Sequence, residues 1–470
     1  MEAIISFFST FPQGSLPLGM WWIFVHGGFI IVAMVALKAA FDLWVQQKQH
    51  EFIHSVPFVL LAIDVPKDTE QGPLAVEHIF STLFGTYGSI TLYEKIMKGK
   101  HQLPISFELV SLGGYIQYLV YTPVIFRDLI EACIYSQYPD AEITEVEDYV
   151  QRIPLDFDTD AYDLWGCEFA LVKPDGYPIK TYPEFEDKLK LDFKDPMAAV
   201  LEVLGRIGPD EDVWLQIVIT TPGNKKWQSH ITHAVHDIMG SGHAKFNIFE
   251  FLIFKLPLQA LDFIGEIIYP LWGDIKEEKK EARKPSDLTP GERNVLEAVQ
   301  RKISKICYFT KFRMIYWGRR ESFAKGLGVS GVVGSLNQFN APDRNAFKPG
   351  KGVTTQAEYF LKESRITRKQ RSILLSYQTR SAHRGLGHGI ILNTEELATI
   401  WHFPVVTVKA PLVKKTAMKK AEPPFALPTY GQGYLKSTSG VMPVAGGGMP
   451  QAGGRSSAPT NLPWVEEESE

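Results

Sequence analysis

The chain has 470 residues and a net charge of −4, with 45% hydrophobic and 12% aromatic residues. This composition excludes a wholly disordered protein and supplies apolar side chains for two or three domains. The three cysteines, Cys133, Cys167 and Cys307, are far apart and form no C-x-x-C pair, which argues against a disulfide framework or a zinc knuckle.

Residues 1–50 are predicted to form an uncleaved membrane anchor. The stretch Leu16–Leu37, LPLGMWWIFVHGGFIIVAMVAL, contains no charged residue and is about as long as the ~20 residues that span a bilayer as a helix. We expect Trp21 and Trp22 near one membrane interface and Trp44 near the other, where indole rings prefer to lie. A buried core helix is the alternative.

The charges beside the anchor predict its orientation. No Lys or Arg precedes the apolar stretch, whereas Lys38 and Lys48 follow it. Because basic flanks stay on the cytoplasmic side, we expect a single-pass protein of the inner (cytoplasmic) membrane. Its C-terminal region would then lie in the cytoplasm.

The rest of the folded chain is predicted to be α+β, in two subdomains. Residues 51–160 show the order helix–strand–strand–helix–strand, and residues 161–428 repeat a similar pattern. This order is typical of a split α/β sandwich (ferredoxin-like), in which helices cover one face of an antiparallel sheet. We therefore expect two such subdomains, each with an antiparallel sheet.

The strongest local pattern is the hairpin ISFELVSLGGYIQYLVYTP. Gly113–Gly114 separates two runs of β-branched and aromatic residues, which is typical of a two-residue turn. Pairing across this turn sets Phe107 opposite Val120. It also sets Leu109 opposite Tyr118, so the apolar side chains share one face.

Capping patterns predict two helix starts. Thr289 and Glu292 form a capping box before a helical run. Further along, Thr394 is expected to cap a short helix that Pro404 ends, with Glu395 and Glu396 favouring its N-terminal dipole.

Two segments stand apart from the predicted subdomains. The apolar insertion 246–272 is interrupted by charges, so we expect an interfacial membrane hairpin, a helical pair that docks on a protein, or core packing. Residues 429–470 are rich in Gly and Pro and are expected to be a disordered tail. Its end, PWVEEESE, is either a docking peptide or a solvated terminus.

Patterns for catalysis are missing from the sequence. The phosphate-loop arrangement G-x-x-x-x-G-K-[ST] does not occur. His230, His233 and His236 do not share one helical face, so we expect no metal site. The glycines of GLGHGIIL fit a bend before a strand as well as a phosphate turn. We predict a non-enzymatic protein without a cofactor, and an enzyme with an unrecognised site ranks last.

The later part of the chain is strongly basic. Residues 300–425 contain 23 Lys and Arg against 7 Asp and Glu, whereas the remainder has 26 basic and 46 acidic residues. With interleaved aromatics, the basic surface of residues 311–384 is a candidate single-stranded DNA surface. Anionic lipid, an acidic protein and a merely solvated face are the alternatives. The candidate DNA-binding residues are Arg319, Arg320, Arg365, Arg368, Lys369, Arg371, Arg380 and Arg384.

The segment LNTEELATIWHFPVVTVKAP, followed by KKAEPPFALP, resembles a region just upstream of the ATPase module in conjugation and type IV secretion-like proteins of bacteria and archaea. The segments ISFELVSLGGYIQYLVYTP, SQYPDAEITEVEDY, VWLQIVIT and LNQFNAPDRNAFKP are similar to that family too. Together they cover most of residues 51–428.

The resemblance implies a membrane-anchored accessory domain without the ATPase module. We therefore expect a non-catalytic scaffold that works with a separately encoded secretion ATPase. Its expected partners are the membrane, that ATPase, single-stranded DNA and further copies of the same chain.

Overall fold

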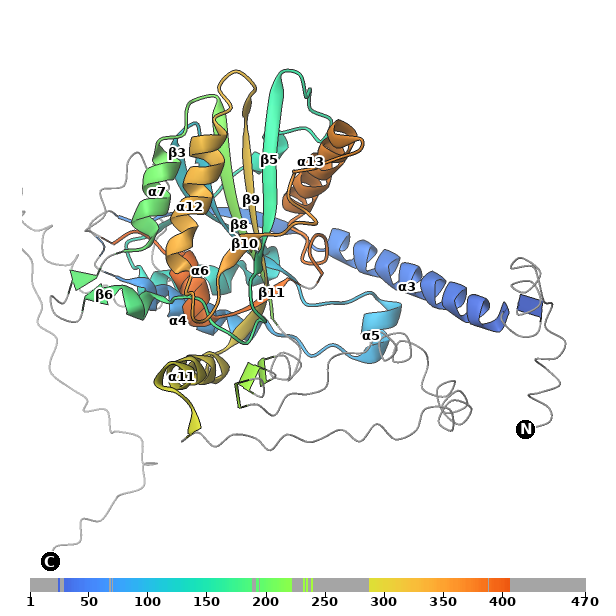
Figure 1. Cartoon of the computed structure of the whole chain (residues 1–470), viewed down its shortest axis with the longest axis horizontal. Coiled ribbons are helices and arrows are strands. Elements are labelled where there is room, and N and C mark those ends of the chain that lie inside the picture. The colour runs from blue at the N-terminus through green and yellow to red at the C-terminus, as the bar shows by residue number, and fades with distance from the viewer. Residues whose placement is uncertain are drawn as a thin grey trace, which may run out of the picture. The chain divides into compact units, whose positions relative to one another are not determined.

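A computed structural model shows the fold (Figure 1). It describes residues 24–25, 29–66, 69, 71–187, 192–193, 195–221, 231–232, 234–235, 238–239, 287–387 and 389–405. The insertion 246–272, the tail 429–470 and the histidines His230, His233 and His236 lie outside these residues, so the predictions made for them are left as they stand.

Nine strands of the described residues form one sheet in which every pairing is antiparallel. The strand order is β10-β5-β9-β8-β2-β3-β1-β4, and β11 pairs with the first part of β9. The strands are β1 (Phe58–Asp64), β2 (Ile105–Leu112), β3 (Tyr115–Pro123), β4 (Glu142–Glu145), β5 (Tyr162–Leu171), β8 (Glu211–Thr220), β9 (Cys307–Arg319), β10 (Phe347–Pro349) and β11 (Ile390–Asn393). A small separate sheet pairs β6 (Glu186–Asp187) with β7 (Asp192–Phe193).

Helices join and cover the strands. The α-helices are α3 (Phe29–Ser55), α4 (Pro73–Leu83), α5 (Leu92–Met97), α6 (Arg127–Gln137), α7 (Met197–Gly205), α11 (Pro290–Ser304), α12 (Val332–Leu336), α13 (Lys362–Gln378) and α14 (Thr394–Ile400). The shorter turns of helix are η2 (Phe84–Thr86), η3 (Val124–Phe126), η4 (Tyr149–Arg152), η5 (Tyr182–Phe185), η7 (Gly326–Gly331) and η8 (Asn337–Phe339). The chain is therefore α+β, as its pattern predicts.

The sheet contains the same element order twice. In the first half, β1-α4-β2-β3-α6-β4 gives the strand order β4-β1-β3-β2. In the second half, β5-α7-β8-β9-α12-β10 gives the equivalent order β10-β5-β9-β8. Both are β-α-β-β-α-β units of the split type. We define these as the first and second halves of the sheet.

The two halves share one continuous sheet, which differs from the expectation of two separate ones. Strand β2 pairs with β8 over eight residues, from Ile105 opposite Ile219 to Leu112 opposite Asp212. The predicted boundary at residue 160 therefore separates two units of the chain without separating two sheets. Pairing of the two edge strands removes an exposed edge from each half.

The hairpin register is confirmed. Phe107 lies opposite Val120 and Leu109 opposite Tyr118. The turn residues Gly113 and Gly114 have φ of 60° and 86°, a left-handed region that glycine enters without steric cost.

The two faces of the sheet are covered by different elements (Figure 1). Helices α4, α6, α7, α12 and α14 pack on one face, where their apolar side chains join those of the strands in the larger core. Helix α13 and turn η4 cover the other face around Trp214, Ile315 and Tyr377. Because strand side chains alternate between faces, both cores draw on the same strands.

Local capping is confirmed for α11 and displaced by one residue for α14. Thr289 and Glu292 form the expected capping box. At α14 the cap is Asn393, whose side chain accepts from the Glu396 N–H at 2.8 Å. The prediction of Thr394 as cap is wrong because the amide of Asn393 already satisfies this donor, and Thr394 becomes the first helical residue.

The structure describes only part of the predicted membrane anchor. Trp21 and Trp22 lie outside the described residues, whereas Trp44 lies on α3 with its ring 6.0 Å from that of Phe41. Several large apolar side chains of α3 are exposed, Leu37 among them at 74%. Among the helices that the structure describes, none is both long enough and apolar enough to cross a membrane.

Candidate functional site

The candidate DNA-binding residues do not form one continuous set. Three of them, Arg365, Arg368 and Arg371, are exposed on α13, while Ile373 and Tyr377 of the same helix pack on the sheet. We call Lys362, Arg365, Arg368 and Arg371 the basic face of α13. Because each is three residues from the next, neighbouring charges lie on adjacent turns, and the set winds around the exposed side of the helix rather than along one line.

Lys369 and Arg365 form hydrogen bonds with main-chain carbonyls of the segment that precedes α13. The Lys369 Nζ donates to the carbonyl oxygens of Thr354 at 3.0 Å and Gln356 at 2.8 Å. Arg365 donates to the carbonyl of Glu358 at 3.0 Å. Burial lowers the pKa of Lys369, and the positive charges of Arg365 and Arg368 lower it further. The lowered pKa indicates crowded positive charge on this side of α13.

Arg319 and Arg320 lie elsewhere, at the end of β9. Arg319 lies 3.6 Å from Asp210, and Arg320 donates to the carbonyl of Thr159 at 2.8 Å. Arg319 also lines an open cleft of about 400 Å³, together with Arg152, Phe157, Tyr162, Asp212 and Trp317.

This cleft mixes both charge signs. Asp158, Asp210 and Asp212 line it beside the two arginines, and the Trp317 ring stacks on that of Tyr162 with centroids 4.8 Å apart. Burial raises the pKa of Asp212, although Arg152 opposes the effect. Three carboxyl groups beside two arginines do not make a phosphate site.

The assignment of Arg380 to the exposed surface needs correction. Its guanidinium is buried and donates to both oxygens of Glu108, at 2.9 and 3.2 Å. It donates to both oxygens of Asp148 as well, at 2.9 and 2.7 Å, and lies 4.0 Å from the ring centre of Tyr121. Burial would lower the pKa of Arg380, yet these carboxylates raise it well above its usual range. Nucleic acid has no access to it.

Beneath α13, four polar side chains form a buried row across the sheet. Glu108 on β2 lies opposite Gln216 on β8, Gln216 lies opposite Arg313 on β9, and Arg313 lies opposite Glu168 on β5. We call these four residues the polar row. The Gln216 Nε2 donates to Glu108 at 3.0 Å, and its Oε1 accepts from Arg313 at 3.2 Å. Arg313 donates to Glu168 at 3.0 Å.

The polar row holds the C-terminal end of α13 and the loop that follows it. Arg313 donates to the carbonyls of Ser376 at 3.0 Å and Arg384 at 2.9 Å. Lys311, beside the row, donates to Glu168 at 3.0 Å and to the carbonyl of Leu386 at 2.7 Å. Burial lowers the pKa of both cations, while Glu168 opposes that shift.

Tyrosines complete the polar row at its other end. The Tyr149 hydroxyl donates to Glu108 at 2.8 Å and lies 2.9 Å from the hydroxyl of Tyr377. Burial raises the pKa of both tyrosines well above its usual value, and the nearby charge of Glu108 adds to the effect. Glu108 and Glu168 are thus occupied by buried donors, so the row fits a structural role better than proton transfer.

Gly385, Leu386 and Gly387 lie over this row. Gly385 has φ of 99°, and a side chain there would collide with the Glu168 carboxylate. The main-chain N–H of Leu386 donates to the same carboxylate at 2.9 Å. The loop is therefore a cover for Glu168 and not a phosphate turn.

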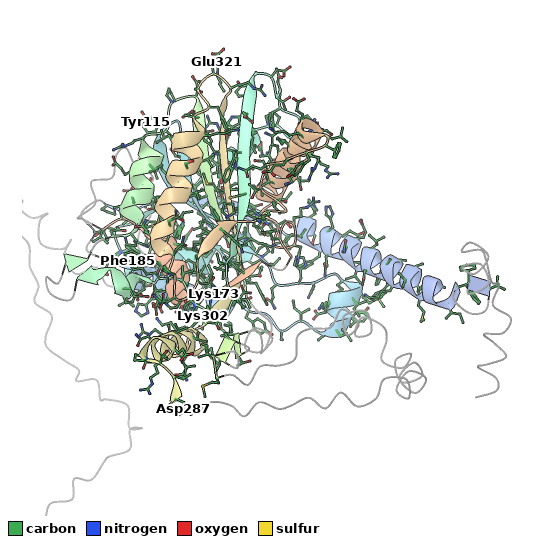
Figure 2. All side chains as sticks on the ribbon, in the orientation of Figure 1. Tyr115, Lys173, Phe185, Asp287, Lys302 and Glu321 are labelled. Atoms are coloured by element: carbon green, nitrogen blue, oxygen red, sulfur yellow. The ribbon has the colours of Figure 1, made fainter. Side chains whose placement is uncertain are left out.

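A second buried polar cluster fixes α14. Lys302 of α11, labelled in Figure 2, lies 2.9 Å from Glu396 with both side chains fully buried. Lys305 lies 2.6 Å from both Glu77 and Glu395. The acidic pair that was expected to favour the helix dipole is thus held by Lys302 of α11 and by Lys305, the residue directly after that helix.

These buried groups lie almost entirely within a matched family region. A family model described as a domain of unknown function (DUF8128) matches residues 87–416. The chain belongs to the DUF8128 family. No curated protein matches the chain.

The DUF8128 match contains all four residues of the polar row, Arg380 and the α13 basic face. It begins after β1 and α4, although β1 lies between β3 and β4 in the sheet. The family region is therefore not the whole folded unit of this protein.

Sequence reasoning missed the polar row, yet a signal for it was present. Each member is a charged or amide residue within a largely apolar strand segment, as in ISFELVSL, VWLQIVIT, KFRMIYW and GCEFAL. A lone charge on the inward side of such a strand requires a buried partner. The sequence shows this need without showing which residue meets it.

Proposed function

We propose that this DUF8128 protein is a non-catalytic, membrane-tethered scaffold of a type IV secretion-like or conjugation machine. It would act beside a separately encoded ATPase. The resemblance of several segments to the accessory region of such proteins supports the proposal, as does the uncharged stretch Leu16–Leu37. The printed sequence contains no phosphate loop that would supply ATP hydrolysis.

The observation that carries the scaffold role is that two buried carboxylates, Glu108 and Glu168, are fully engaged by hydrogen-bond donors. The carboxylates of Glu108 and Glu168 accept from arginine, lysine, tyrosine and main-chain donors. This network fixes α13 on the sheet, and the separate Lys302–Glu396 pair fixes α14. A rigid frame of this kind suits a protein that presents surfaces to partners.

The tether is tested by deleting residues 16–37 and measuring resistance of the protein to carbonate extraction from membranes. We expect the full chain to stay in the membrane fraction and the deletion variant to be released. Release of the full chain would overturn the tether.

The machine assignment needs a separate test. Crosslinking in native membranes, followed by mass spectrometry, should identify an ATPase with a phosphate loop joined to this chain. Crosslinks only to proteins unrelated to secretion or conjugation would overturn that part of the proposal.

A second candidate function is binding of single-stranded nucleic acid by the basic face of α13. The exposed aromatic residues Tyr359 and Phe360 directly before the helix favour it, because bases stack on such rings. Its test is salt-sensitive binding of an oligonucleotide that is lost on reversal of Arg365, Arg368 and Arg371. Binding that survives the reversal would overturn it.

A further inference from the structure

An apolar tip precedes the basic face of α13. Tyr359, Phe360 and Leu361 follow one another and are 84%, 89% and 79% exposed. We call these three residues the apolar tip. Contiguous exposed apolar residues beside charged ones mark interaction sites more often than scattered exposed residues do.

Two of the three residues of the apolar tip have an unfavourable backbone conformation. Tyr359 has φ of 69° and Leu361 has φ of 51°, both in the left-handed region that non-glycine residues rarely adopt. Such conformations cost free energy and are concentrated at functional sites. The hydrogen bonds of Arg365 to Glu358 and of Lys369 to Gln356 hold the chain on both sides in place.

The surroundings of the apolar tip are basic. Residues 351–371 contain six Lys and Arg against two Glu. Two of these cations, Lys362 and Arg368, are exposed and have no ion-pair partner in the part of the chain that the structure describes. An apolar tip with a basic collar complements an anionic bilayer, which offers negative headgroups above an apolar interior.

We propose that the apolar tip inserts into the anionic leaflet of the membrane, with Lys362 and Arg368 on lipid headgroups. A lipid surface fits better than a protein partner because a fluid bilayer receives protruding side chains without a matching pocket. It also fits better than nucleic acid, since Leu361 is as exposed as the aromatics and offers no stacking surface for a base. The inference rests on the proposed membrane tether, which would hold the tip near the bilayer.

Fluorescence of a probe on Phe360 tests the insertion. The full chain carrying Phe360→Cys is labelled with NBD and placed in nanodiscs of phosphatidylcholine, with or without phosphatidylserine. The native cysteines Cys133, Cys167 and Cys307 are buried, which favours labelling at the new site. Brominated lipid should quench the probe only when phosphatidylserine is present. A probe at Tyr115→Cys, the exposed first residue of β3 (Figure 2), should remain unquenched.

Charge reversal supplies the matched control. Lys362→Glu with Arg368→Glu should reduce quenching several-fold, because each cation near an anionic surface contributes about a fivefold factor. Arg206→Glu with Arg301→Glu changes the net charge equally, at an exposed site directly after α7 and another on α11, and should leave quenching unchanged.

The outcomes separate this inference from the tether. Failure of the full chain to stay in nanodiscs overturns the tether, while quenching at Phe360→Cys by added anionic vesicles would still support the tip. A probe that remains as unquenched as that at Tyr115→Cys in every lipid overturns the insertion. A response to a single-stranded oligonucleotide with none to phosphatidylserine overturns it in favour of nucleic acid.

Discussion

The two halves of the sheet share one design and differ in what is attached to it. In the first half a turn of two glycines joins β2 to β3, whereas residues 221–306 join the equivalent strands β8 and β9. That longer connection contains α11 and the apolar insertion 246–272. The second half is also followed by α13, β11 and α14. The repeated β-α-β-β-α-β order is thus a frame, and α13, with its basic face and apolar tip, is an addition to its second half.

The polar row is what makes the two halves one unit on the α13 side. Glu108 and Asp148 belong to the first half, Gln216, Arg313 and Glu168 belong to the second, and Arg380 follows both. Buried ion pairs gain little over apolar packing when intact, but the loss of one partner leaves an uncompensated charge.

The largest effect is expected from Arg380→Leu. It leaves Glu108 and Asp148 without their shared cation, which should lower the free energy of unfolding by about 3–5 kcal/mol. Urea denaturation followed by fluorescence measures the change. The control Arg371→Leu removes an exposed cation 3.1 Å from Asp156 and should cost less than about 1 kcal/mol. If both variants lost the same free energy of unfolding, the burial of Arg380 would not be what makes it important for stability.

The next largest loss of stability is expected from a substitution in the apolar core where β2 of the first half pairs with β8 of the second. Leu215 on β8 lies opposite Leu109 on β2, and both are buried in the larger core. We expect Leu215→Ala to cost about 2–5 kcal/mol, because the truncation removes apolar contacts and leaves a cavity. Probes placed in each half should still unfold in one transition. Two separate transitions in the unaltered protein would mean that the halves are independent domains.

A buried histidine–aspartate contact links elements on the opposite face. The His402 ring lies 2.9 Å from Asp195, which also accepts from the N–H of Met197 at 2.7 Å. Burial alone would raise the pKa of Asp195, but the contact with His402 and the main-chain donors lower it overall. Asp195→Asn should cost about 1.5–3 kcal/mol near neutral pH, as expected for a charged hydrogen bond.

The pH dependence of this contact follows from the lowered pKa. The stability that Asp195 contributes is present above its unfolded pKa of about 3.9 and is lost as pH falls through the lower folded value. The difference in unfolding free energy between the unaltered protein and Asp195→Asn should therefore shrink below about pH 4. A difference that stays constant from pH 3 to 7 would contradict the lowered pKa.

The smallest effect on stability is expected from shortening the connection between β8 and β9. If residues 241–286 are an addition to the frame, a short Gly/Ser linker in their place should change the unfolding free energy by less than about 1 kcal/mol. Loop closure costs only about 0.6 kcal/mol per doubling of length. Thermal and urea unfolding measure the change. A loss comparable to that of Leu215→Ala would show that the segment packs as part of the core.

Local sequence patterns determined several features of this protein. The two glycines at 113 and 114 set the β2–β3 register, and Thr289 with Glu292 set the start of α11. Each of these depends on residues close together in the chain. The α+β class follows from the alternation of such patterns, and the exposed charges of Arg365 and Arg368 could be expected from the polar side of a helix.

Only the tertiary structure decided the junction of the two halves and the fate of Arg380. The pairing of β2 with β8 joins segments about a hundred residues apart, and the pattern of either strand fits other partners. In the sequence Arg380 is one cation in a basic region. In the structure it follows α13 with φ of 46°, and its side chain donates to Glu108, 272 positions earlier in the chain. Whether a charge faces water or the core depends on such distant contacts, and for that reason the sequence alone placed Arg380 on the exposed basic surface.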